Sequence, residues 1–468
     1  MNSNNNYAKA SEIFNSLPQE CTDNLSPLID REREKLDKTI IVLDDDPTGT
    51  QTVHNVYVLT EWSVDSIEEE FRNRTEIFYI LTNSRSLTVS AANSLAKEIG
   101  QNLMEASKRT GRDFLVVSRS DSTLRGHYPN EVNALAKSIN LENAVTFLIP
   151  AFFEGGRMTI NDIHYVQEKE WLIPASETPF AQDKTFGFKN SNLKKYVEEK
   201  TKGKIGQENV HSISIKDLRS MEIDDLSKKI KSFPPGSVCI INAVSYKDLE
   251  IFTVAMYRSG RQVIVRSAAS IVPVLAGIDK KPLLDVEHFQ QGRKGAVLSI
   301  VGSYVPKTSA QLEQLKKVKN AHFVELDINK ILKKASEFNS KLTRVINDML
   351  DKGENIVLYT SRKLIADKDP EKSLQIGQEV SKFITELFKA IESKPKAILA
   401  KGGITSSDIA TKALGVKKAL VVGQVAAGVP VWALGNETKF PRINYVIFPG
   451  NVGDDETLKE VFLKLSGT

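Results

Sequence analysis

Short apolar runs alternate with longer stretches of helical periodicity along most of the chain. The runs are four to six residues long and rich in β-branched and aromatic side chains, which is typical of buried strands. We predict strands at 40–43, 55–60, 77–81, 114–117, 145–150, 238–242, 263–267, 296–301, 355–360, 397–401 and 445–448. Helical periodicity falls between them, at 66–74, 90–109, 131–138, 246–258 and 375–391. This alternation predicts an α/β fold with mainly parallel sheets flanked by helices.

Polar side chains follow these apolar runs where each run ends. The first run is followed by Asp44, Asp45 and Asp46, and then by Pro47 and Gly49, which mark a turn. Open parallel sheets bind ligands at the carboxyl ends of their strands. Adjacent carboxylates repel one another, so we interpret the three acids as functional, facing a cation, a hydroxyl-rich ligand or a proton-transfer task. A solvated acidic turn is the alternative interpretation.

Two further strand ends carry groups that suit a polyhydroxy acid. Arg85 follows the run at 77–81, and a planar guanidinium can bind a carboxylate through two hydrogen bonds. The run at 114–117 leads into a segment in which hydroxyls and Asp121 could contact hydroxyl groups of a ligand, while an arginine pairs with its carboxylate or a phosphate. Its candidate binding residues are Arg119, Ser120, Asp121 and Ser122. A surface arginine and a self-capped polar turn are the structural alternatives.

Glycine-rich turns follow strands in the second half of the chain. Glycine lets backbone N–H groups approach a phosphate closely, although the Gly-Lys-Ser/Thr ending of a Walker A loop is missing. The candidate residues are Ser303, Gly402, Gly403, Ile404, Thr405, Gly450 and Asn451. Simple tight turns are the alternative. Thr308–Gln311 has the spacing of a helix capping box, and Gly423–Pro430 is interpreted as a loop.

Bulk properties exclude several classes of protein. A chain of 468 residues is expected to form two or three domains. The net charge of +4 is spread among interspersed acids and bases, which argues against a nucleic-acid partner. Two cysteines without metal-ligand spacing favour a reducing compartment. The polar N-terminus and the lack of a run near the ~20 apolar residues of a membrane span predict a cytoplasmic protein.

The motifs, taken in order, resemble the four-carbon acid sugar kinase family, over nearly the whole chain after residue 38. The resemblance rests on Asp45–Gly49, Asn83–Arg85, Asp121–Gly126, Gly302-Ser303, Gly402–Thr405 and Gly450-Asn451. The chain departs from the family pattern at Arg119, where a lysine is usual, and in the third acid and the 38-residue lead. These departures concern the identity of the substrate more than the reaction.

This resemblance implies how the chain is divided and what it binds. Residues 1–38 are then an N-terminal extension, 39–280 a domain that binds the sugar acid, and 293–468 a domain that binds the nucleotide, with the active site in the cleft between the two domains. It implies ATP as phosphoryl donor and Mg²⁺ as cofactor. The substrate would be an acid of the threonate, erythronate or 3-oxo-tetronate class. The stereoisomer, the hydroxyl that reacts and the oligomeric state, a homo-oligomer included, stay open.

Combined with the residues, the resemblance suggests a mechanism. Asp45 or Asp46 accepts the proton of the attacking hydroxyl, and Asp45, Arg85 and the 119–122 segment hold the acid. Two alternatives are a phosphatase of the haloacid dehalogenase type, with Asp44 as nucleophile and Asp46 as acid and base, and a sugar-acid sensor without catalysis.

Overall fold

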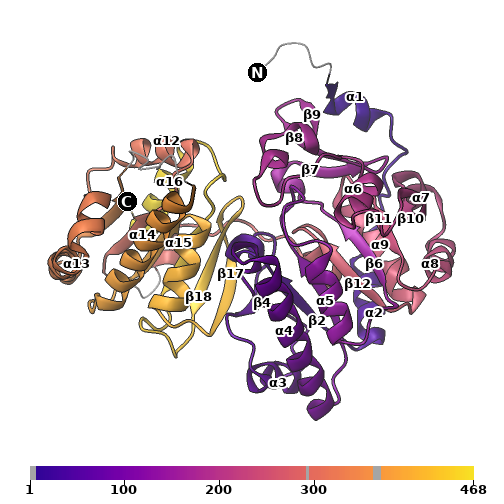
Figure 1. Cartoon of the computed structure of the whole chain (residues 1–468), viewed down its shortest axis with the longest axis horizontal. Helices are drawn as coiled ribbons and strands as arrows, with labels where there is room; N and C mark the ends of the chain where they lie inside the picture. Colours follow the sequence, from indigo (N-terminus) through magenta and orange to yellow (C-terminus); the bar gives the residue numbers. More distant parts are fainter. Residues whose placement is uncertain (1–6, 291–294, 362–369, 468) are drawn as a thin grey trace. The chain divides into compact units, whose positions relative to one another are not determined.

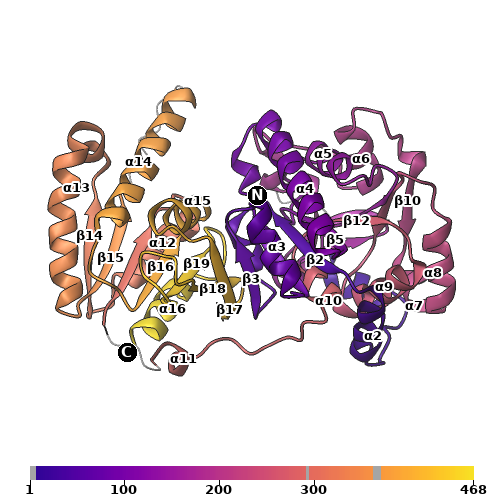
Figure 2. The same cartoon turned by 90° about the horizontal axis from the view of Figure 1, so that it is seen from below.

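The computed structural model describes residues 7–290, 295–361 and 370–467. The chain forms two compact units (Figures 1 and 2). The first unit takes the chain up to Thr52 and then Glu61–Lys280, and the second takes Val53–Thr60 and the chain from Lys281 onward. The predicted α/β architecture is confirmed, because the first unit is built on a parallel sheet and the second on a mixed sheet with a parallel half, each flanked by helices.

The first unit contains a parallel sheet in which the strands follow the order β10-β11-β6-β12-β5-β2-β4. Their residues are almost all buried, since helices cover both faces of a parallel sheet and select near-continuous apolar runs. The strands are β2 (Thr39–Asp44), β4 (Ile77–Leu81), β5 (Phe114–Arg119), β6 (Val145–Ile149), β10 (Val210–Ile213), β11 (Val238–Ile241) and β12 (Val263–Ser267).

Helices pack in two groups around this sheet. One group runs α3–α4–α5, and the other gathers α2, α7, α8 and α10 around α9. Helix α4 ends at Gly111, which adopts the left-handed conformation as its cap. The bounds are α2 (Ser26–Leu36), α3 (Val64–Arg72), α4 (Val89–Thr110), α5 (Asn130–Ser138), α6 (Leu193–Lys200), α7 (Ile215–Ser220), α8 (Ile223–Ser232), α9 (Tyr246–Ser259) and α10 (Ile271–Leu275).

A small antiparallel sheet in the first unit was not predicted from the sequence. Its order is β1-β9-β8-β7, with β1 (Ala8–Lys9), β7 (Arg157–Ile160), β8 (Ile163–Glu168) and β9 (Trp171–Pro174). The strands are short and alternate buried with partly exposed positions, so their apolar content is too low to form a visible run. The first helix, α1 (Ala10–Asn15), packs its apolar side chains against this sheet.

The second unit contains a mixed sheet in the order β3-β17-β18-β19-β16-β13-β15-β14. The pairs from β3 to β19 are antiparallel, and those from β19 to β14 are parallel. The strands are β3 (Val56–Leu59), β13 (Val297–Val301), β14 (Ala321–Leu326), β15 (Asn355–Thr360), β16 (Ala397–Lys401), β17 (Lys418–Ala426), β18 (Val429–Leu434) and β19 (Asn444–Phe448).

The helices of this unit also form two groups, α11–α16–α12 and α13–α14–α15. Their bounds are α11 (Val286–Gln290), α12 (Pro306–Leu315), α13 (Ile328–Asp351), α14 (Pro370–Ala390), α15 (Gly403–Asp408) and α16 (Thr457–Ser466). None of the helices in the described parts of either unit is long and apolar enough to cross a membrane.

Two local predictions for the second unit are wrong. Gly423–Pro430 is not a loop but the centre of the β17–β18 hairpin, whose register shifts twice near Gly423 and Ala426. Its glycines and alanines weaken the strand signal, although every second residue of β17 is buried. Thr308–Gln311 is not a capping box either, because α12 already begins at Pro306 and contains both residues.

Candidate functional site

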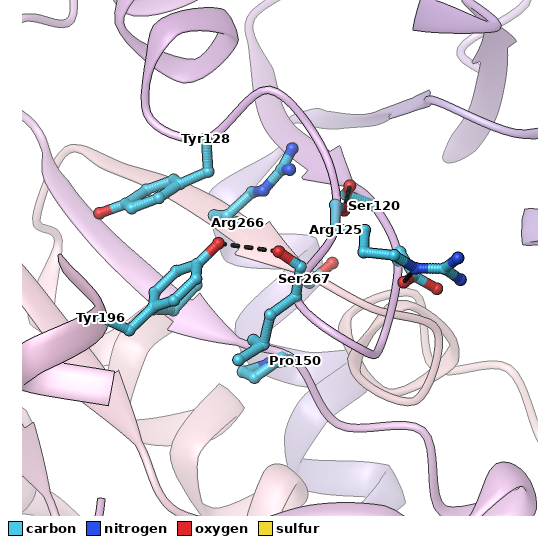
Figure 3. A pocket seen from close by; sticks show the side chains of 10 residues that line it. Ser120, Arg125, Tyr128, Pro150, Tyr196, Arg266 and Ser267 are labelled. Carbon is cyan, nitrogen blue, oxygen red and sulfur yellow. Dashed lines mark hydrogen bonds and ion pairs between the residues drawn. The ribbon is translucent and has the colours of Figure 1, made fainter. Parts of the chain in front are cut away.

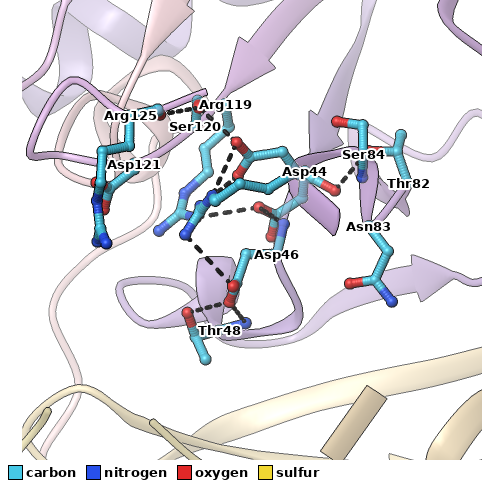
Figure 4. A network of polar contacts seen from close by, with 12 residues as sticks. Asp44, Asp46, Thr48, Thr82, Asn83, Ser84, Arg119, Ser120, Asp121 and Arg125 are labelled. Atoms are coloured by element: carbon cyan, nitrogen blue, oxygen red, sulfur yellow. Dashed lines mark hydrogen bonds and ion pairs between the residues drawn. The ribbon is translucent and has the colours of Figure 1, made fainter. Parts of the chain in front are cut away.

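Strand β2 ends at Asp44, and Asp45 and Asp46 follow it directly. Each of the three carboxylates accepts a hydrogen bond from an arginine. Asp44 is almost fully buried, and its Oδ1 accepts a hydrogen bond from Nη1 of Arg119 at 3.1 Å (Figure 4). Arg119 ends the neighbouring strand β5, which pairs in parallel with β2 and places the two residues opposite each other. The sheet register therefore fixes this buried ion pair.

Arg85 holds the other two carboxylates from the turn that follows β4. It binds Asp45 with two nitrogens, Nε to Oδ2 at 3.2 Å and Nη2 to Oδ1 at 2.5 Å, and Nη1 lies 3.4 Å from Oδ2 of Asp46. Asp46 also accepts hydrogen bonds from the backbone N–H and hydroxyl of Thr48. The side chain of Asp45 is 2% exposed and that of Asp46 is 22% exposed, so Asp46 is the more accessible of the two.

The cluster combines three carboxylates with two guanidinium groups, which leaves one negative charge in excess. Burial, together with the charges of Asp45 and Asp46, raises the pKa of Asp44 to about 7 against the opposing effect of Arg119. Burial also acts to raise the pKa of Asp46, but the charge of Arg85 and the hydrogen bonds from Thr48 outweigh it and lower that pKa. Asp46 is therefore ionised at neutral pH, whereas Asp44 is the place where the cluster takes up a proton.

Gly49 closes the turn over Asp44. A Cβ atom at this position would lie 1.8–2.2 Å from the atoms of the Asp44 carboxylate, so only glycine fits. The turn, η1 (Pro47–Thr50), thus packs directly against the carboxylate of Asp44. A phosphatase nucleophile must reach a phosphorus atom, and Asp44 lacks the exposure for that role.

The segment after β5 brings its predicted residues to the same edge of the sheet. Ser120 donates to Oδ2 of Asp45 at 2.5 Å, which ties this segment directly to the carboxylates. Asp121 accepts from Nε of Arg125 at 2.7 Å, and its pKa is lowered because Arg85 and Arg125 outweigh its burial. Ser122 is buried, and its backbone oxygen contacts Nε2 of His164 at 2.7 Å.

A second buried polar network lies beside this cluster. Arg266, at the end of β12, donates to the Ser118 hydroxyl at 2.8 Å and lies 3.4 Å from Oε2 of Glu131. Glu131 also accepts from the Ser84 hydroxyl at 2.6 Å. Gly126, at φ +136°, lets the backbone pass close to both Arg266 and Ser120. This network was missed in the sequence, where an arginine at the end of an apolar strand was its only signal.

A pocket opens next to these two networks (Figure 3). It contains about 260 Å³ of empty space, including space open to solvent. Its walls combine the polar groups Ser120, Asp121, Arg125, Arg266 and Ser267 with the rings of Tyr128 and Tyr196 and with Leu124, Leu148 and Pro150. The hydroxyl of Ser267 is buried and has no hydrogen-bond partner among the residues that the structure describes. Hydrogen-bonding groups on an apolar wall are typical of a site for a small polar ligand.

In the second unit, three loops that follow β13, β16 and β19 converge. These strands are parallel neighbours, so their carboxyl ends lie on one edge of the sheet. A Cβ atom at Gly302 would lie 2.2 Å from the Thr405 hydroxyl, and one at Gly450 would lie 3.0 Å from the Ser303 hydroxyl. The structure thus brings Ser303, Gly402, Thr405 and Gly450 together, while Ile404 is 68% exposed beside them.

Lys401 connects these loops from beneath and was not assigned a role from the sequence. Its fully buried Nζ donates to the carbonyls of Pro449 at 2.7 Å and Gly450 at 3.3 Å and lies 4.0 Å from the centre of the Phe448 ring. Its backbone oxygen accepts from the N–H groups of Gly302 and Ser303. Burial lowers its pKa to about 7.

Thr308 and Gln311, for which the sequence predicts a helix cap, instead bind a loop. The Thr308 hydroxyl donates to the carbonyl of Gly450 at 3.1 Å, and Gln311 donates to the carbonyls of Val452 and Asp454. Together with Lys401, they bind carbonyl groups of the 449–454 segment on its inner side.

Comparison with known proteins identifies the two units by class. Residues 40–275 match the model of a sugar-binding N-terminal domain, and residues 298–458 match that of a nucleotide-binding C-terminal domain. The chain thus combines a sugar-binding type of domain with a nucleotide-binding type of domain. It belongs to the four-carbon acid sugar kinase family, as the order of its motifs predicted.

Relatives and solved structures agree with this assignment. The D-erythronate kinase of Heliobacterium modesticaldum is 22% identical over 324 residues, which are 67% of this chain and 68% of the relative. A Haemophilus influenzae protein is 18% identical with a TM-score of 0.61, over 90% of this chain and 98% of its own. A Salmonella typhimurium LT2 protein described as a tRNA synthase is 15% identical with a TM-score of 0.68, over 91% and 98%. At these identities the two structures support the fold alone.

The close contact between Gly49 and Asp44 predicts a stability defect. Gly49→Ala should lower the free energy of unfolding by about 1–3 kcal/mol, the usual cost of overpacking, because the new methyl group displaces the buried carboxylate. Urea unfolding measures the change. Gly377→Ala is the matched control, since an added Cβ meets open space there in an exposed helix and should stabilise by up to ~1 kcal/mol. Equal effects of the two substitutions would contradict the packing described.

The raised pKa of Asp44 predicts a pH dependence of stability. Between pH ~4 and ~7 the folded protein keeps a proton on Asp44 that the unfolded chain has already released, so this group makes stability fall as pH rises through that window. Asp44→Asn cannot titrate. Unfolding free energies measured from pH 4 to 8 should therefore shift in favour of the variant as pH rises. A difference between the two proteins that stays constant over this range would show that Asp44 is ionised throughout.

Proposed function

We propose that this protein is an ATP-dependent kinase that phosphorylates a hydroxyl group of a four-carbon sugar acid of the threonate, erythronate or 3-oxo-tetronate class. The observation that carries the proposal is the cluster of Asp45, Asp46 and Arg85 at the carboxyl edge of the unit that matches a sugar-binding domain. The match of the other unit to a nucleotide-binding domain and the similarity to a D-erythronate kinase support it.

Asp46 is the residue that we propose to accept the proton of the attacking hydroxyl. It is ionised at neutral pH, it is the more exposed of the two carboxylates on Arg85, and Thr48 fixes its orientation with two hydrogen bonds. Asp45 is buried and bound by two nitrogens of Arg85, so it acts chiefly by holding Arg85 and Ser120 in place. Phosphoryl transfer has a loose transition state, in which a weak base that orients the hydroxyl is sufficient.

The same edge offers the contacts that hold the acid. Asp45, Arg85, Arg119, Ser120, Asp121 and Ser122 form the binding set in this proposal. Arg85 and Asp121 present their side chains to the ligand, whereas Arg119, Ser120 and Ser122 are buried and support them from beneath. The alternation of carboxylates, guanidinium groups and hydroxyls matches a ligand that carries both hydroxyl groups and a negative charge.

The three loops of the second unit are proposed to bind ATP. Ser303, Gly402, Gly403, Ile404, Thr405, Gly450 and Asn451 form this set. Lys401, Thr308 and Gln311 bind carbonyl groups of the 449–454 loop on its inner side, which leaves other backbone groups of the loop for phosphate oxygens. The exposed Ile404 offers an apolar contact. The donor must then reach the acceptor hydroxyl in line, and positioning of this kind supplies most of the rate enhancement.

Mg²⁺ is expected to accompany the phosphates. The described residues contain no group of three or more His, Cys, Asp or Glu side chains arranged to hold a metal ion. Mg²⁺ fits this arrangement, because it usually keeps several waters and binds through substrate phosphates and one or two carboxylates. When bound, it would neutralise charge that develops on the phosphates. We assign it no protein ligand.

A screen of ADP release tests the proposal. The purified full-length chain is incubated with ATP, Mg²⁺ and each of the four-carbon acids of both configurations, and ADP is measured by a coupled assay. We expect release that depends on the acid, with a preference for one stereoisomer. Binding of an acid without any ADP release would support a sensor, and release of inorganic phosphate from a phosphorylated acid without ATP would support a phosphatase.

Replacement of the proposed base should affect turnover selectively. Asp46→Asn should lower kcat by at least ~100-fold, the low end of general-base contributions, and leave the affinity for ATP nearly unchanged. Steady-state kinetics and nucleotide titration measure the two effects. Asp113→Asn, a change at an exposed carboxylate of the same unit, serves as the control and should be neutral. Turnover of Asp46→Asn equal to that of the wild type would remove Asp46 from this role.

A further inference from the structure

The arginines at the carboxyl edge of the first unit differ in whether a carboxylate neutralises them. Arg85 pairs with Asp45 and Asp46, and Arg119 pairs with Asp44. The other two paired arginines are Arg266, with Glu131, and Arg125, with Asp121 and Asp183. These four guanidinium groups already hold acidic side chains of the protein. They are therefore poor candidates for the sole partner of an incoming carboxylate.

Arg157 is the exception in this part of the fold. It begins strand β7, and within the described residues it forms no ion pair with any carboxylate. Its Nη1 donates to the carbonyl of Gly155, while its Nε is buried and finds no hydrogen-bond partner in the described part of the chain. A largely buried cation without a direct ion-pair partner is costly, and a ligand anion in contact with it would lower that cost.

Arg157 shares an aromatic ring with Arg125. The guanidinium carbon of Arg125 lies 5.0 Å from the centre of the Phe180 ring, and that of Arg157 lies 5.8 Å from it. Burial and the charge of Arg125 lower the pKa of Arg157 against the opposing attraction of Asp121 and Glu168, neither of which forms a direct ion pair with it among the described residues. Two like charges on one ring repel each other, and an anion between or beside them would relieve that repulsion.

The polar groups near Arg157 are already engaged in other contacts. The neighbouring His164 is neutral at physiological pH, because burial lowers its pKa to about 4, and it is hydrogen-bonded to Thr159 and to the backbone of Ser122. Asp121 already accepts hydrogen bonds from Nε of Arg125 and from the hydroxyl of Thr123. Arg125 also lines the pocket of Figure 3, which connects the arginine pair to that pocket through one of its two members.

We propose that Arg157, together with Arg125 on the shared Phe180 ring, binds the carboxylate of the sugar acid. This inference rests on the proposed function and assigns the two ends of the substrate to different arginines. Arg125 and Arg157 hold the acid end, whereas Arg85 keeps Asp45 and Asp46 in place at the end where the hydroxyl reacts. Arg157 thereby determines that the substrate is an acid rather than a neutral polyol.

The test compares charged and neutral substrates in the full-length protein. For the wild type and Arg157→Met, kcat/KM is measured with erythronate and threonate and with their primary amides, which keep the hydroxyls and lose the charge. We expect Arg157→Met to lower kcat/KM at least ~10-fold for the acids, the low end for hydrogen bonds to a charged group, and less than ~2-fold for the amides. Arg157→Lys, which keeps the charge but not the planar fork, should recover part of the loss.

Calorimetric binding of the acids makes the test independent of turnover. Arg157→Met should weaken binding of the acid that the wild type binds best, and Arg72→Met, at an exposed arginine of α3, should not. Equal losses for acids and amides, or no loss for either, would overturn the inference while the kinase proposal stands. If the wild type binds an acid but releases no ADP, the kinase proposal fails, and selective loss of acid binding in Arg157→Met still supports this site. Absence of acid binding by the wild type would overturn both.

Discussion

The attraction between two guanidinium groups and three adjacent carboxylates is the interaction on which the first unit's site depends. Without Arg85 and Arg119, the like charges of Asp44, Asp45 and Asp46 would be buried at the end of one strand and would destabilise the sheet edge. Each arginine comes from a strand next to β2 or from the turn after it, so the pairing depends on the parallel register. The carboxyl end of the sheet is in this way a structural ion cluster, and it is also the surface that we propose binds the substrate.

Much of this arrangement could be predicted from the sequence, because buried parallel strands leave a strong signal. Apolar runs such as 40–43 and 263–267 fix the strands, and the polar residues that follow them must lie on one edge. The family could be predicted as well, from motifs that occur in order. Which charges pair with which could not be predicted, since it depends on how neighbouring strands are ordered. Arg266 and Glu131 illustrate this, as they are 135 positions apart in the chain and meet only in the folded sheet.

Features with a weak local signal were missed for other physical reasons. Strands β7–β9 are short, and β8 and β9 alternate buried with less buried positions. Strand β17 contains a glycine, and its pairing with β18 shifts register twice. Lys401 was overlooked because a lysine at a strand end is usually solvated. Here it is enclosed by the Phe448 ring and by the carbonyls of Pro449 and Gly450. The sequence around Lys401 contains no pattern that predicts this burial.

Strand β3 has a consequence for how the protein can be divided. The chain leaves the first unit at Thr52, contributes Val56–Leu59 to the sheet of the second unit, and returns at Glu61. In this strand Leu59 pairs with Lys418 of β17. One strand of the second unit is therefore synthesised long before the other strands of the same sheet. A gene fragment that starts at residue 281 encodes an incomplete sheet, with the backbone edge of β17 left open to association with other chains. Neither unit is therefore formed by one continuous stretch of chain. A fragment that is to form the complete second unit must also include the eight-residue segment Val53–Thr60.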